Sequence, residues 1–145
     1  MSKSIPIDKL QPETQPQLVS IAILESVTAF LPEFSIFKGD IEADPGKDLG
    51  IRIDCRLEGS VVIPSGGVIH IGPTGSVKGA SIEADYIFIE GSVESKIVSR
   101  KGVEITGTAV VKGQVEYQGS LNMHNMAKVR ASIQYAGPDD LPVTN

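Results

Sequence analysis

The chain has 145 residues, enough for one domain, and a net charge of −5 at pH 7. The acidic balance argues against a nucleic-acid-binding groove, and the basic residues alternate with acidic ones along the sequence, as on a solvated surface. No apolar stretch is long enough to form a helix that spans a membrane, and the single cysteine, Cys55, excludes an internal disulfide.

Residues 1–33 are predicted to be an N-terminal tail with a short apolar segment. Residues 1–17 are polar and proline-containing, which indicates a flexible tail. The apolar segment LVSIAILESVTAFL, residues 18–31, can form a short amphipathic helix that ends before Pro32, or a strand over the first coil; we favour the helix. It would either pack on its own domain or a neighbour, or rest on a membrane surface. The residues predicted for this membrane or partner segment are Leu18, Ile21, Ile23, Leu24, Val27, Phe30 and Leu31.

From residue 34 to residue 135, apolar and polar residues alternate in short runs, and the pattern recurs. One apolar row contains Ile53, Ile71, Ile89, Ile105 and Met123, spaced 18, 18, 16 and 18 residues apart. A second row with the same spacing contains Ile51, Ile69, Ile87, Val103 and Leu121. Three further rows contain Gly59, Val77, Val93, Val111 and Val129; Val61, Gly79, Ser95, Gly113 and Ala131; and Ile63, Ile82, Ile97, Val115 and Ile133. Such a repeat indicates a solenoid whose coils stack on their neighbours.

Alternation with a period of two indicates strands, and about 17 residues suffice for a coil of three short strands and three corners. Because connections between parallel strands favour a right-handed path, we predict an all-β fold: a right-handed parallel β-helix of about six coils. Strict six-residue faces, which a left-handed hexapeptide helix requires, are missing. Cys55 lies in a ladder position beside Ile53, which predicts a buried small residue. The last ten residues, 136–145, contain two prolines and two adjacent aspartates, which indicates a disordered C-terminal tail.

No obvious capping helix follows Tyr135, and each end coil of the predicted solenoid lacks a neighbour on one side. Bare coils carry unpaired backbone groups, so the column should either aggregate or polymerise end to end by strand pairing. The residues predicted for this polymer interface are Phe34, Ile36, Phe37 and Ile41 at one end and Met123, Val129, Ile133 and Tyr135 at the other.

No motif in the chain predicts catalysis, a bound cofactor or a metal. His70 and His124 are interpreted as surface residues, since two histidines cannot build a three-histidine zinc site within one chain. Glu83, Glu90, Glu94 and Glu104 alternate with basic residues and are interpreted as a solvated face. The turns GPTG and PSGG lack the lysine, hydroxyl residue and helix of a phosphate-binding loop.

The runs IFKGDIEA, LGIRIDCRLEGSVV, IHIGPTGSVKGASIEADYIFIEGSVESKI and VEITGTAVVKGQV resemble the bactofilins, a family of bacterial polymer-forming cytoskeletal proteins. The resemblance covers residues 34 to 135. It implies a right-handed β-helix that assembles into nonpolar filaments without a nucleotide. It also implies a homopolymer in the cytoplasm or at the inner face of the membrane, where the filament positions cell-wall-modifying enzymes.

Two other functions fit a β-solenoid. One is a hexapeptide-type enzyme, such as an acyltransferase or a carbonic anhydrase, which strict six-residue periodicity and a metal would support. The other is a non-polymerising adaptor whose N-terminal segment binds a partner or lipid.

Overall fold

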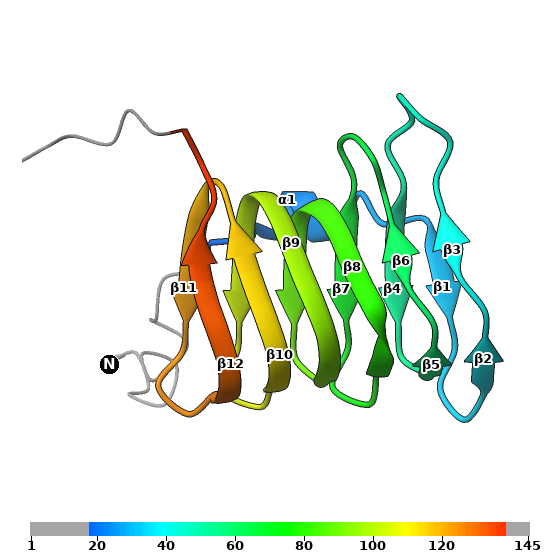
Figure 1. Ribbon diagram of the computed structural model, residues 1–145. Coiled ribbons are helices and arrows are strands. Elements are labelled where there is room, and N and C mark those ends of the chain that lie inside the picture. The colour runs from blue at the N-terminus through cyan, green and yellow to red at the C-terminus, as the bar shows by residue number, and fades with distance from the viewer. Residues whose placement is uncertain (1–17, 139–145) are drawn as a thin grey trace, which may run out of the picture.

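A computed structural model describes residues 18–138, which form a single column of stacked coils (Figure 1). The predicted tails at residues 1–17 and 139–145 lie outside the described residues. The elements in chain order are α1 (Ile21–Leu24), β1 (Ala29–Leu31), β2 (Ile36–Lys38), β3 (Ile41–Glu42), β4 (Gly50–Ile53), β5 (Arg56–Glu58), β6 (Val61–Val62), β7 (Val68–Ile71), β8 (Ser76–Ile89), β9 (Ser92–Ile105), β10 (Val110–Tyr117), β11 (Ser120–Met123) and β12 (Lys128–Tyr135).

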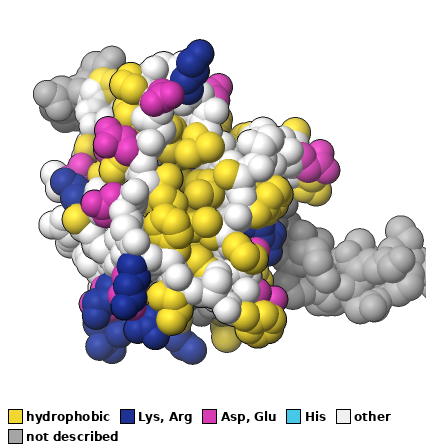
Figure 2. Space-filling view, turned by 90° about the vertical axis from the view of Figure 1, so that its right-hand side faces the viewer, with side chains coloured by type: hydrophobic (Ala, Val, Ile, Leu, Met, Phe, Trp, Pro, Cys, Tyr) yellow, Lys and Arg dark blue, Asp and Glu magenta, His cyan; other side chains and the backbone are white. Residues whose placement is uncertain are grey.

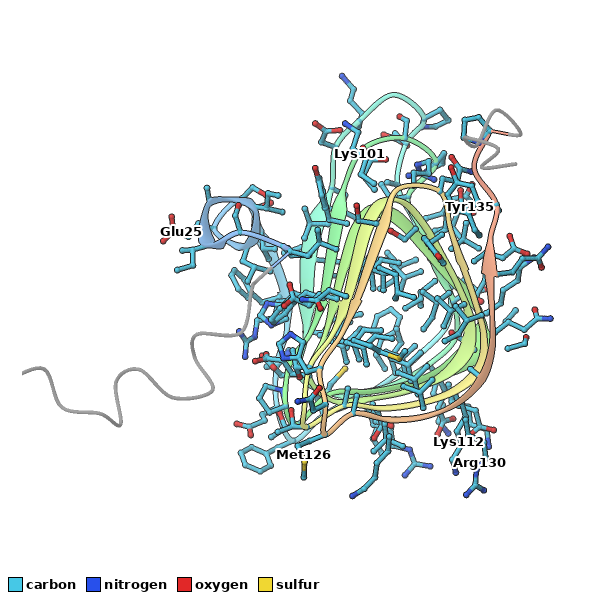
Figure 3. The ribbon with its side chains drawn as sticks, turned by 90° about the vertical axis from the view of Figure 1, so that its left-hand side faces the viewer. Glu25, Lys101, Lys112, Met126, Arg130 and Tyr135 are labelled. Atoms are coloured by element: carbon cyan, nitrogen blue, oxygen red, sulfur yellow. The ribbon has the colours of Figure 1, made fainter. Side chains whose placement is uncertain are left out.

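All strand pairs are parallel, and the strands form three faces around a triangular cross-section (Figure 3). The first face stacks β1, β4, β7, the ends of β8 and β9, and β11. The second face stacks β2, β5 and the beginnings of β8, β9, β10 and β12. The third face stacks β3, β6 and the later parts of β8, β9, β10 and β12. This arrangement gives about six coils, the first formed by β1 to β3 and the sixth by β11 and β12.

The coil is right-handed. In Figure 3, the C-terminal end faces the viewer, and the chain passes Met126, Arg130 and then Tyr135 in an anticlockwise direction as it approaches the viewer. The predicted fold class, a right-handed parallel β-helix of about six coils, is therefore confirmed.

The apolar rows found in the sequence form the interior of the column. Ile53, Ile71, Ile89, Ile105 and Met123 are register partners on the first face, as are Ile51, Ile69, Ile87, Val103 and Leu121. In the middle coils these side chains are fully buried, and Cys55 lies in the same core as predicted. Each coil thus covers the aliphatic side chains of the next coil, which a single coil could not bury alone.

The other three predicted rows are wrong in the second coil. Two of them are right from the third coil onward, and the row through Gly79 is right only from Ser95 onward, because the register shifts between Lys78 and Ser81. Val77 pairs with Leu57 rather than with Gly59, and Ile82 pairs with Val61 rather than with Ile63. The cause is the corner between the first two faces: Ile53 to Leu57 is two residues shorter than Ile71 to Val77. The longer corner contains the GPTG turn, in which the Gly75 amide donates to the Gly72 carbonyl at 2.9 Å.

The solenoid begins earlier than the predicted residue 34, because β1 already pairs with β4. The preceding helix is only one turn long, so the favoured helix over residues 18–31 is wrong beyond Leu24, and the alternative strand is right for Ala29–Leu31. Ser20 caps the helix through its side chain, and after Glu25 the chain turns to meet the first face. A Cβ on Gly50 would lie 2.8 Å from the Val27 Cα, so the segment enters the column where glycine permits close approach.

Candidate functional site

The N-terminal end of the column is an apolar surface. Figure 2 looks onto this end and shows hydrophobic side chains gathered across its middle. Phe37 points inward in register with Leu57, yet it is 37% exposed, whereas Leu57 is fully buried. The difference arises because a neighbouring coil covers Leu57 on each side, whereas Phe37 has a neighbouring coil on one side only. Leu31 and Ile41 are also only partly buried against the core.

Phe34 is the most exposed large apolar residue of this end, at 98%. It lies in the turn between β1 and β2, where the Ser35 hydroxyl donates to the Pro32 carbonyl at 2.6 Å. Its φ of 65° places it in the left-handed region, as the only described residue other than glycine there. A bulky residue in this conformation is disfavoured by about 1–2 kcal/mol. The turn therefore presents an aromatic ring to solvent although the isolated subunit gains nothing from it.

The C-terminal end is bare in the same way. Met123 and Ile133 continue the inward rows of Ile105 and Val115, which are both fully buried. In the sixth coil these positions are 40% and 39% exposed, respectively. Because the rows point into the column, the exposed part of each side chain faces the open end.

The strands of both end coils also present unpaired backbone edges. Within residues 18–138, β1, β2 and β3 pair only with strands of the second coil. At the other end, β11 pairs only with β9, and β12 only with β10. Each end therefore combines an exposed apolar core with N–H and C=O groups that can extend a parallel or antiparallel ladder.

The structure places all eight predicted interface residues on these two end coils, four at each end. They differ in orientation. Ile36 points out of the second face and is 60% exposed, while Val129 points inward and is partly buried. Tyr135 packs edge-on against Tyr117, with ring centroids 5.5 Å apart. Of the eight, Phe37, Met123 and Ile133 lie in inward rows and are exposed at the open ends, and Phe34 is exposed in a turn of the first coil.

The N-terminal segment packs on its own solenoid. It runs along the first face, with α1 against β7 and Val19 fully buried (Figures 1 and 3). The Val19 amide donates to Glu104 Oε1 at 2.8 Å, and Glu104 Oε2 lies 2.7 Å from His124 Nε2 and 3.3 Å from Asn122 Nδ2. Of the predicted membrane or partner residues, Ile21 and Phe30 are strongly exposed, Val27 is buried and the remaining four are partly buried.

This arrangement corrects two predictions. Glu104, interpreted as part of a solvated face, is fully buried, and His70, interpreted as a surface residue, is 7% exposed. His70 does point out of the solenoid, but it contacts Phe88 edge-on and lies 2.8 Å from a Glu90 oxygen. The period of two predicts the outward direction of both side chains. It carries no signal that Val19, 85 positions earlier, covers Glu104, or that Phe88 and Glu90 contact His70.

The first face also contains an ion pair beside this cluster. Arg52 Nε donates to Asp54 Oδ2 at 2.8 Å. This hydrogen bond, aided by the charges of Asp54 and Glu90 and opposed by partial burial, raises the pKa of Arg52. Between residues 18 and 138, no three His, Cys, Asp or Glu side chains are grouped so that they could hold a metal ion. No helix in that same range is long and apolar enough to cross a membrane.

Comparison with known proteins identifies the family. The family model "Bactofilin: Polymer-forming cytoskeletal" matches residues 29–134. A bactofilin from Thermus thermophilus, solved by cryo-electron microscopy as double helical filaments, is 27% identical, with a TM-score of 0.64 over 75% of this chain and all of that chain. A crystal structure of a point mutant of Thermus thermophilus bactofilin is 29% identical, with a TM-score of 0.57 over 66% of this chain and 97% of that chain. A search of curated proteins finds no match.

The family match runs from the start of β1 to Gln134 in β12, and so includes both bare end coils. Sequence, fold and family model agree. The chain belongs to the bactofilins, a family of polymer-forming cytoskeletal proteins.

Proposed function

We propose that this protein is the subunit of a homopolymeric filament, joined end to end through its first and sixth coils. The observation that carries the proposal is that inward-facing positions buried in the middle coils are exposed in both end coils. Stacking another subunit there would bury these side chains and pair the open strand edges, so the same contacts that hold the coils together would hold subunits together.

Assembly of this kind needs no nucleotide. Its driving force is the burial of aliphatic and aromatic side chains, at about 1.5–3 kcal/mol for each one fully covered. A handful of such residues at each junction can offset the translational and rotational freedom that a subunit loses. We assign the protein a structural role rather than a catalytic one.

We further propose that the filament serves as a scaffold in the cytoplasm, peripheral to the inner membrane, and that it positions partners there, such as cell-wall-modifying enzymes. The support for this part is the family membership together with Ile21 and Phe30, which are exposed in the N-terminal segment. Liposome co-sedimentation of wild type and an Ile21→Asn/Phe30→Asn variant measures the contribution of this segment, because deletion of residues 1–31 would also remove β1 from the first coil. Unchanged binding of the variant would contradict a membrane role for the segment.

The test of end-to-end assembly is a matched pair of substitutions in the sixth coil. Ile133→Arg places a charge at an exposed inward position, where a stacked subunit would have to bury it. Gln134→Arg places the same charge one residue later, where the side chain points outward and is exposed. In sedimentation without nucleotide, wild type and Gln134→Arg should pellet as polymer, and Ile133→Arg should stay in the supernatant. Equal pelleting of both variants would contradict assembly through this end.

A further inference from the structure

The second face gathers basic side chains that are scattered in the sequence. One outward row contains Lys38, Glu58, Lys78, Glu94, Lys112 and Arg130. The neighbouring outward row contains Ile36, Arg56, Ser76, Ser92, Val110 and Lys128. These rows carry six basic and two acidic side chains, a net charge of +4, on a chain whose net charge is −5. Basic and acidic side chains alternate in the first row from Lys38 to Lys112, as the sequence predicts, but the face as a whole has an excess of basic side chains.

The arrangement is visible along the column axis. Lys112 and Arg130 project side by side from the lower right of the column in Figure 3, and basic side chains cluster at the lower edge of Figure 2. Their strands are adjacent, so like charges face each other at the spacing of neighbouring strands, about 4.8 Å. Direct neighbours of like charge repel, so the isolated subunit is not stabilised by this placement.

Most of these charges have no partner in the described part of the chain. Arg56 and Glu58 form an ion pair at 3.0 Å. Five of the basic residues form no ion pair with any other described residue: Lys38, Lys78, Lys112, Lys128 and Arg130. All five are exposed. The face therefore presents free cationic groups to whatever lies in front of it.

We propose that the second face is a docking surface for an anionic lipid membrane. The strands of this face stack in one sheet from the first coil to the sixth, so its side chains form a broad array that can approach a planar surface together. Each lysine or arginine near an anionic leaflet strengthens binding about fivefold, which is the equivalent of about 1 kcal/mol. The face belongs to a single subunit, so it does not depend on polymerisation, and a filament would repeat it at every subunit.

A shallow depression on the same face suits a phosphate group. It has a volume of about 140 Å³ and lies between Lys78 and Lys112, with Ser76 and Ser92 in its lining. Serine hydroxyls donate hydrogen bonds, and lysine supplies positive charge to phosphate oxygens. Glu94 also lines the depression and opposes an anion there, so the attraction depends on the lysines that flank it.

Two other partners fit this face less well. A second copy of the chain carries exposed carboxylates without an ion pair in the described residues, namely Glu25, Glu33, Asp40, Glu42, Asp44 and Asp48. Apart from Glu25, they lie in the first coil and the loop after it, so they form no acidic row that runs along the column as this face does. Single-stranded nucleic acid is bound in basic grooves with aromatic side chains on which bases stack. Neither outward row of the second face contains an aromatic residue.

The test compares Lys78→Gln/Lys112→Gln with Lys47→Gln/Lys101→Gln. Both double variants remove two charges. The first pair lies on the second face away from the end coils, and the second pair is exposed elsewhere. Each full-length protein is sedimented with vesicles of phosphatidylcholine alone or mixed with phosphatidylglycerol. The same series in an Ile133→Arg background separates membrane binding from polymerisation.

We expect wild type to bind the mixed vesicles and not the neutral ones, and to detach at high salt. Lys78→Gln/Lys112→Gln should bind at least tenfold more weakly, since two fivefold effects multiply, while Lys47→Gln/Lys101→Gln should lose less than threefold. Equal loss in both double variants, or equal binding to neutral vesicles, would overturn the proposal. Tighter binding to a DNA duplex than to the mixed vesicles at the same salt would also overturn the proposal, provided that Lys78→Gln/Lys112→Gln abolishes the binding to DNA.

Discussion

Phe34 allows assembly to be weakened without damage to the subunit. Its ring is 98% exposed, so it contributes almost nothing to the core, and its φ of 65° costs a bulky residue about 1–2 kcal/mol. Asparagine tolerates the left-handed region far better than phenylalanine. Phe34→Asn should therefore leave the isolated subunit as stable as wild type, or slightly more stable.

The same substitution should strongly reduce polymerisation. If a neighbouring subunit covers the ring, wild type gains about 1.5–3 kcal/mol at that junction. Losing this energy raises the critical concentration for assembly roughly tenfold to a hundredfold, since each 1.4 kcal/mol is a factor of about ten.

The assay measures light scattering against subunit concentration, together with thermal unfolding of subunits kept below the critical concentration. Ile21→Asn is the control, because Ile21 is 64% exposed on α1, at the side of the column rather than at its end. An unchanged critical concentration in Phe34→Asn would refute the assignment of this residue to the junction. A melting temperature of the isolated Phe34→Asn subunit below that of wild type would contradict the claim that the backbone at Phe34 is strained.

Four further substitutions test the internal structure. Ile89→Ala removes a fully buried side chain from the fourth coil and should reduce the free energy of unfolding by about 2–5 kcal/mol in denaturant titrations. Met123→Ala, at the same row in the sixth coil, should cost the unpolymerised subunit under about 1 kcal/mol; equal costs would contradict an open end. Gly91→Ala should destabilise by about 1–3 kcal/mol, because its Cβ would lie 2.3 Å from the Gly75 carbonyl oxygen of the neighbouring coil; a melting temperature equal to that of wild type would contradict this packing. Glu104→Gln should weaken the anchor of the N-terminal segment by about 1–3 kcal/mol and speed hydrogen exchange at the Val19 amide, while amides in the middle coils stay protected. Unchanged exchange at Val19 would show that the segment is held elsewhere.

The column could be predicted from the sequence because its interior repeats. A row such as Ile71, Ile89 and Ile105 recurs at nearly constant spacing, and a side-chain period of two fixes which residues point inward. The prediction failed where the corner lengths change, since Ile53 to Leu57 and Ile71 to Val77 enclose different numbers of residues. Spacing alone does not report how many residues a corner holds.

The bare ends were also predictable, because they follow from stacking without a cap. The contact between Val19 and Glu104 was not, since it joins residues far apart in sequence and belongs to no repeat. The basic second face was only partly predictable from the sequence. Its rows have the same period as the apolar rows, but the charges alternate in sign along the chain, and only the strand register shows that Lys112 lies beside Arg130.

Electron microscopy of the purified full-length protein, in the absence of nucleotide, tests the central claim most directly. The account predicts filaments in which subunits stack along the solenoid axis, with density continuous across the first and sixth coils. Dispersed single columns at high protein concentration, or filaments joined by their sides with both ends open to solvent, would contradict it.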